Sequence, residues 1–144
     1  MKTEKDVAIE INTIQIAEDM EEQRSVLRVS GKMFEKEKTR YLFYEEPSED
    51  LDIPEKVRII LEHDRVKLKK SGNAEWEMEF AVGKEWNSPY YTAFGTIQTR
   101  IHTSEMELAE KDDELTLKVS YHLILQESYA ADCRMVLRIT PAIQ

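Results

Sequence analysis

Cysteine is nearly missing from this chain of 144 residues, which contains one, Cys133. A single cysteine excludes an intrachain disulfide and is typical of a reducing compartment, so we expect a cytoplasmic protein. Glycine is also scarce, with four residues in the whole chain, which leaves little room for a loop that cradles phosphates. At this length one domain over residues 1–144 can bury a core large enough to be stable without covalent staples.

Long apolar runs and an excess of basic side chains are missing as well. No segment is long enough to span a bilayer, and the N-terminal residues MKTEKDVAIE alternate with charge, unlike a signal peptide. The chain has 20 lysines and arginines against 29 acidic side chains, a formal net charge of −9. Such a surface repels phosphate backbones and anionic lipids, so the sequence predicts neither a nucleic-acid partner nor a membrane partner. In the basic segment RVKLKK (65–70), basic and apolar residues mostly alternate, which favours a strand with one solvated face.

What the chain does have is a two-residue alternation of apolar and polar side chains. It is clear in EWEMEF (75–80), ELTLKVSYHLIL (114–125), MVLRI (135–139) and KVRIILE (56–62). A period of two predicts strands with one buried face, and no segment offers a convincing helical stripe. Because short polar turns separate the strands, we expect an antiparallel meander.

The expected fold is therefore all-β: a single antiparallel meander of about eight to ten strands that closes as a barrel. Closure removes the exposed edges that an open sheet would leave. The strands expected at 90–103 and 114–125 are long, and long strands favour a tilted barrel over a flat sandwich.

Two local features predict irregularities in these strands. Apolar residues at 7, 9 and 11 hold one phase and Ile14 and Ile16 take the other, a slip that predicts a β-bulge. Gly95 follows the bulky run YYTAF and precedes a clean alternation, so we interpret it as a structural corner where a barrel strand bends.

Several short motifs, in this order and spacing, resemble one known family. They are Tyr44-Glu45-Glu46, Ser71-Gly72, Met78 with Phe80, then Tyr90, Thr92, Phe94 and Gly95, followed by Ile101, Thr103 and ELTLKVSYHLIL. The chain resembles, from about residue 7 to 140, the YwiB-like family of uncharacterised bacterial β-barrel proteins, a domain of unknown function. That resemblance implies a lipocalin-like (calycin-type) fold. It implies no activity, cofactor or catalytic residue.

The lumen of such a barrel is the candidate binding site. With the apolar phase inward, Thr99, Thr103 and Tyr121 are its polar members, and a few hydroxyls in an apolar cavity are typical of small-ligand pockets. Tyr44, Tyr90 and Trp86 are expected at the rim. The same hydroxyls equally suit a barrel filled by its own side chains, and both interpretations stay open. The candidate ligand-binding residues are Tyr44, Glu46, Trp76, Tyr90, Thr99, Thr103 and Tyr121.

The spacing of acidic residues and histidines in the sequence does not favour a metal site or a catalytic site. Glu45 and Glu46 are adjacent on a strand and point to opposite faces, so they form no acid–base pair; an inward glutamate would need Arg40, Lys56 or a tyrosine hydroxyl as a partner. The acidic loop at 45–52 lacks the ligand spacing and the glycine of a calcium loop. The three histidines lack zinc-type spacing, and two of them, His102 and His122, lie opposite the apolar phase. We therefore predict no metal site, no cofactor and no catalytic residue.

Three functional hypotheses follow. The first is a non-enzymatic barrel that binds a small hydrophobic or amphipathic molecule in its lumen. The alternative is a structural or interaction module with a packed core, which docks on a protein partner or on itself. The third is an enzyme that uses Glu46 at the pocket mouth as a glutamate of raised pKa.

Overall fold

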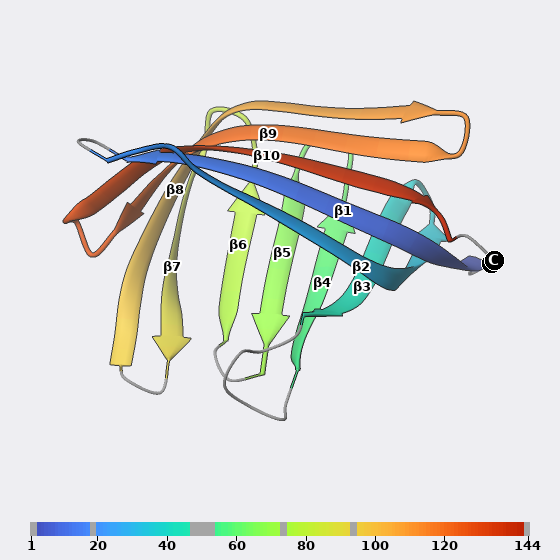
Figure 1. Ribbon diagram of the computed structural model, residues 1–144, viewed down its shortest axis with the longest axis horizontal. Coiled ribbons are helices and arrows are strands. Elements are labelled where there is room, and N and C mark those ends of the chain that lie inside the picture. The colour runs from blue at the N-terminus through green and yellow to red at the C-terminus, as the bar shows by residue number, and fades with distance from the viewer. Residues whose placement is uncertain (1–2, 18–19, 47–53, 73–74, 93–94, 143–144) are drawn as a thin grey trace.

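The computed structural model describes residues 3–17, 20–46, 54–72, 75–92 and 95–142, and in these residues the chain forms strands and no helix (Figure 1). The strands are β1 (Thr3–Ala17), β2 (Gln23–Lys36), β3 (Thr39–Glu46), β4 (Glu55–Leu61), β5 (Val66–Ser71), β6 (Trp76–Phe80), β7 (Glu85–Thr92), β8 (Gly95–Lys111), β9 (Glu114–Leu125) and β10 (Tyr129–Pro141). The all-β prediction is confirmed.

All ten strands belong to one antiparallel sheet. Its order is β6-β5-β4-β3-β2-β1-β10-β9-β8-β7, so consecutive strands of the chain are paired, with the exception of β6 and β7, and β1 pairs with β10. The two outer strands, β6 and β7, come into contact and lie side by side in Figure 1. The sheet thus curls into a nearly closed barrel, as the meander pattern predicts.

The contact between β6 and β7, which we call the seam, lacks the ladder of hydrogen bonds found between the other strands. Instead, the Trp86 indole Nε1 donates a hydrogen bond to the main-chain oxygen of Glu77 across it, at 3.2 Å. Beyond the seam, the Gly83 amide donates to the carbonyl of Thr103 on β8, at 3.0 Å. A side chain and a turn therefore hold the two sheet edges together.

The inward positions of the alternating strands form the core. Leu42, Phe80, Ile101 and Leu137 have no exposed surface, and they belong to one cluster of buried side chains drawn from strands all around the sheet. Burying each such side chain stabilises the fold by about 1.5–3 kcal/mol. The middle of the barrel is thus packed, and a cavity lies at each of its ends.

The predicted bulge in the first strand is wrong. β1 pairs with β2 and with β10 in unbroken register, and the register shift lies in β8, between Thr103 and Glu105. The change of phase along β1 has another cause. Near the end of this strand the outward position 16 is apolar, with Ile16 49% exposed, and polar residues such as Thr13 take the inward positions.

Gly95 also differs from its expected place. It is the first residue of β8 and pairs with Thr92, the last residue of β7, so the strand expected at 90–103 is divided between two antiparallel strands. Its φ of +131° lies in the region that favours glycine. Gly95 therefore lies where the chain reverses direction between β7 and β8, and not at a bend within one strand.

Candidate ligand-binding site

One end of the barrel holds a cavity of about 390 Å³, which we call the mouth cavity. It lies where β1 and β3 end and β2 and β6 begin. Three of its apolar lining residues, Leu68, Met78 and Phe80, are each less than 10% exposed. Because these three side chains alternate inward on β5 and β6, the cavity has an apolar floor.

A polar cluster lies at the entrance of the mouth cavity. The Glu46 carboxylate accepts a hydrogen bond from Lys70 Nζ at 3.2 Å, and the Tyr44 hydroxyl donates to its other oxygen at 3.5 Å. Lys70 Nζ also lies 5.6 Å from the centre of the Trp76 ring, within the range of a cation–π contact. The ion pair between Glu46 and Lys70 is therefore flanked by two inward aromatic side chains. Tyr44 contacts Glu46, and Trp76 contacts Lys70.

The strand register explains why these residues meet. Tyr44 on β3 pairs with Val57 on β4, Val57 pairs with Lys70 on β5, and Lys70 pairs with Trp76 on β6. Residues that are paired across strands point to the same face of a sheet. Antiparallel pairing therefore places Tyr44, Lys70 and Trp76, from three different strands, in one inward row. Glu46 lies two residues beyond Tyr44 on the same face of β3.

Burial controls the chemistry of the hydroxyl in this cluster. Burial of Tyr44, and then the negative charge of Glu46, raise the pKa of the Tyr44 phenol well above its usual value. The phenol is therefore protonated at neutral pH and acts as a donor. The side chains of Glu46 and Lys70 are 19% and 26% exposed, so their ion pair is half-buried and solvent still reaches it.

A second inward row borders the mouth cavity through Tyr121. Thr103, Tyr121, Cys133 and Gln15 are paired in turn across β8, β9, β10 and β1. Burial raises the pKa of the Tyr121 phenol and that of the Cys133 thiol, and the Tyr121 ring lies 4.8 Å from that of Phe80. Cys133 is thus a buried neutral thiol beside the cavity.

The mouth cavity brings together four of the residues proposed from the sequence: Tyr44, Glu46, Trp76 and Tyr121. Thr99 and Thr103 do not line it. They are 3% and 0% exposed, and their hydroxyls have no hydrogen-bond partner among the described residues.

Two aromatic residues expected at the rim have other outcomes. The side chain of Tyr90 lies outside the described residues. Trp86 lies at the seam, where its indole donates a hydrogen bond to the main chain of β6.

Lys70 belongs to the candidate site and is not among the residues proposed from the sequence. The alternation in RVKLKK predicts a strand with a solvated basic face, and the partners expected for an inward glutamate are Arg40, Lys56 or a tyrosine hydroxyl. The Tyr44 hydroxyl is such a partner of Glu46, whereas the cationic partner is Lys70. Lys70, however, is in phase with Val66 and Leu68, which are both buried. That two-residue spacing was the signal, because it places the ammonium on the inward face.

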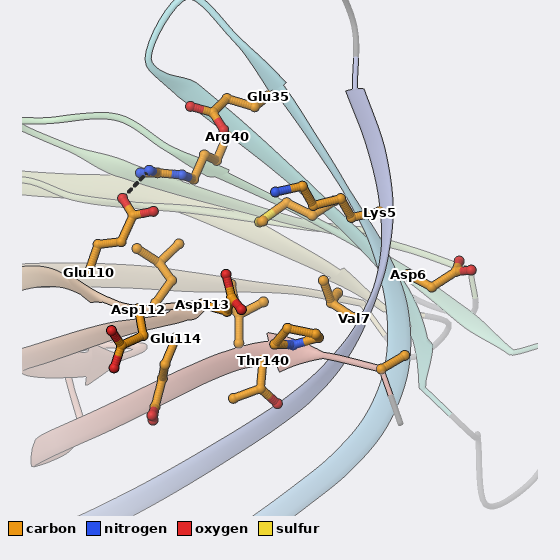
Figure 2. A pocket seen from close by; sticks show the side chains of 15 residues that line it. Lys5, Asp6, Val7, Glu35, Arg40, Glu110, Asp112, Asp113, Glu114 and Thr140 are labelled. Carbon is orange, nitrogen blue, oxygen red and sulfur yellow. Dashed lines mark hydrogen bonds and ion pairs between the residues drawn. The ribbon is translucent and has the colours of Figure 1, made fainter. Parts of the chain in front are cut away.

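The opposite end of the barrel holds a second cavity of about 350 Å³ with a different lining (Figure 2). Arg40 points inward there, with 17% of its side chain exposed, and forms an ion pair with Glu110. In Figure 2 these two side chains reach toward each other, while Asp6 points away. Further carboxylates from Glu35 and from residues 112–114 make this end acidic.

Two classes of site can be assessed on the described ranges. In these ranges no three histidine, cysteine, aspartate or glutamate side chains come close enough together to hold a metal ion. In the same ranges we find no helix with the length and apolar character needed to cross a membrane.

A meander of ten strands in one nearly closed sheet, with a cavity at each end, defines a small antiparallel β-barrel protein. Residues 9–137 match the family described as "Domain of unknown function (DUF1934)", and the chain belongs to that family. None of the curated proteins compared with the chain matches it.

Among solved structures, the chain is similar to the YwiB protein from Bacillus subtilis. The TM-score is 0.84, at 15% sequence identity, over 97% of this chain and 94% of that one. This similarity shows a common fold, and with the family match it confirms the resemblance noted in the sequence.

Proposed function

We propose that the protein is a non-enzymatic binding barrel that holds a small, partly apolar molecule in the mouth cavity. The observation that carries this proposal is the cavity itself, about 390 Å³ in volume, with an apolar floor and a polar cluster at its entrance. Small-molecule sites have volumes of about 300–1,000 Å³ and combine apolar walls with a few polar groups that orient the ligand.

The proposal extends to the setting of the protein. A lipocalin-like barrel in the bacterial cytoplasm fits a chain with one cysteine, which is buried, and a fold shared with a protein of Bacillus subtilis. Glu46 then orients a ligand rather than transferring protons, because its carboxylate is already engaged by Lys70 and Tyr44.

A specific observation favours a second candidate, an interaction module. Ile16, Met20 and Val26 are apolar and about half exposed, and they lie near the turn between β1 and β2. Exposed apolar groups in one region are typical of surfaces that dock on proteins.

Native mass spectrometry of the protein purified from its own host separates the two candidates. We expect a mass increment of a small molecule that disappears on unfolding. The variant Thr13→Trp places a large ring on the inward side of the mouth cavity and should abolish the increment, whereas Ile14→Trp, one residue away on the outward face, should keep it. A bound protein in place of a small molecule would favour the interaction module. An increment of equal size in both variants would contradict the proposed site.

A further inference from the structure

We propose that the ligand of the mouth cavity is an amphipathic amine, whose ammonium group takes the position that Lys70 Nζ now fills. This inference rests on the proposed function and adds the chemical class of the ligand. The apolar body of the amine would lie on the floor formed by Leu68, Met78 and Phe80.

The first argument is that the entrance is already built around a positive charge. Lys70 Nζ lies 3.2 Å from a Glu46 oxygen and 5.6 Å from the centre of the Trp76 ring. A carboxylate beside the face of a tryptophan is a favourable place for an ammonium group, and desolvation strengthens the attraction. In the structure the Lys70 ammonium group occupies this place.

The second argument is the difference in freedom between the two ion-pair partners. Lys70 has a four-carbon stem and a more exposed side chain than Glu46, 26% against 19%, so its ammonium can turn out into water at small cost. Glu46 has a shorter side chain and also accepts the hydrogen bond of Tyr44. A cation can thus replace Lys70, whereas an anion that bound Lys70 would bring a second negative group close to Glu46.

The third argument is the field of the whole protein. The formal net charge is −9, and the opposite end of the barrel is acidic as well. A negative surface raises the local concentration of cations and lowers that of anions. Long-range electrostatics and the local cluster therefore favour the same class of ligand.

The test compares four compounds with the same chain: octylammonium, octyltrimethylammonium, octanoate and octanol. Binding is measured by isothermal titration calorimetry at neutral pH and repeated at high salt. We expect the two cations to bind about tenfold more tightly than octanoate and octanol, since one carboxylate contact with a cation–π contact is worth about that factor.

Three variants make the test specific. Glu46→Gln should weaken binding of both cations about tenfold and leave octanol unchanged, whereas Glu45→Gln, the same change on the outward face, should leave all four compounds unchanged. Lys70→Met should strengthen cation binding, because it removes the internal competitor.

The outcomes distinguish the two proposals. If octanoate or octanol binds as tightly as the cations, or if Lys70→Met weakens cation binding, the amine assignment is overturned and the binding barrel stands. If none of the four compounds binds at millimolar concentration while the variants remain folded by circular dichroism, the proposed function is overturned with it.

Discussion

Gly31 lies on β2 where the backbone of β3 leaves no room for a side chain. A Cβ atom at this position would lie 2.5 Å from the main-chain oxygen of Phe43 and 2.6 Å from Cδ1 of Ile9. Real Cβ atoms essentially never come so near, and the first contact is with backbone, which cannot turn away. Glycine is therefore required here because a side chain would not fit. Gly31 is paired with Tyr44, which lines the mouth cavity.

We expect Gly31→Ala to lower the free energy of unfolding by about 1–3 kcal/mol, the usual cost of forcing an extra methyl group into a packed region. Urea denaturation followed by circular dichroism measures the change. Ser30→Ala is the matched control on the exposed face of the same strand, and it should change the stability by less than about 0.5 kcal/mol. Equal effects of the two variants would refute the steric argument.

At the scale of elements, the seam between β6 and β7 is the place where the barrel closes without a ladder of strand-to-strand hydrogen bonds. Both strands are edges of the sheet, and edges present unpaired amides and carbonyls. The hydrogen bond from Trp86 to Glu77 joins them at one point. Since β6 also carries Trp76 and the floor of the mouth cavity, the seam borders the candidate site.

We expect Trp86→Phe to keep the ring packing and remove the indole donor, so that the amides of β6 exchange with solvent deuterium faster by about fivefold. Hydrogen exchange with mass spectrometry resolves the strands. The long pair of β1 and β10 serves as the internal control and should be unchanged. Uniform acceleration over all strands would mean that the substitution lowers global stability instead of opening the seam.

For the molecule as a whole, buried tyrosine and cysteine side chains should make the free energy of unfolding depend on pH in the alkaline range. Burial is the main cause that raises the pKa values of Tyr44, Tyr121 and Cys133. A group whose pKa is higher in the folded chain keeps its proton longer than in the unfolded chain. Its contribution is complete below the unfolded pKa and is lost as the pH rises toward the folded pKa.

The free energy of unfolding should therefore fall between about pH 9 and 11, by about 1–3 kcal/mol, because the unfolded chain releases these protons first. Urea denaturation at several pH values measures the decline. In the triple variant Tyr44→Phe, Tyr121→Phe, Cys133→Ala the decline should be shallower, whatever its stability at pH 7. An unchanged slope would show that other groups cause it.

The sequence by itself determined the strands, the meander and much of the inward face. A two-residue alternation indicates which side of a strand is apolar. It predicts that Tyr121 and Trp76 point inward, and both line the mouth cavity. It held enough information to place Lys70 as well. It gave a wrong prediction at Ile14 and Ile16, where the outward face of β1 becomes apolar, because the alternation shows which residues are apolar and not which way they point.

Only the tertiary structure decided which inward residues meet. The row of Tyr44, Lys70 and Trp76 depends on the hydrogen-bond register between β3, β4, β5 and β6. In the sequence Thr99 is a candidate ligand-binding residue in the same way as Tyr44 and Trp76, yet it is buried away from the mouth cavity. The physical reason is that alternation is a local property of each strand. Register and closure depend on pairing between segments far apart in the chain, and they determine where the barrel is packed and where it is open.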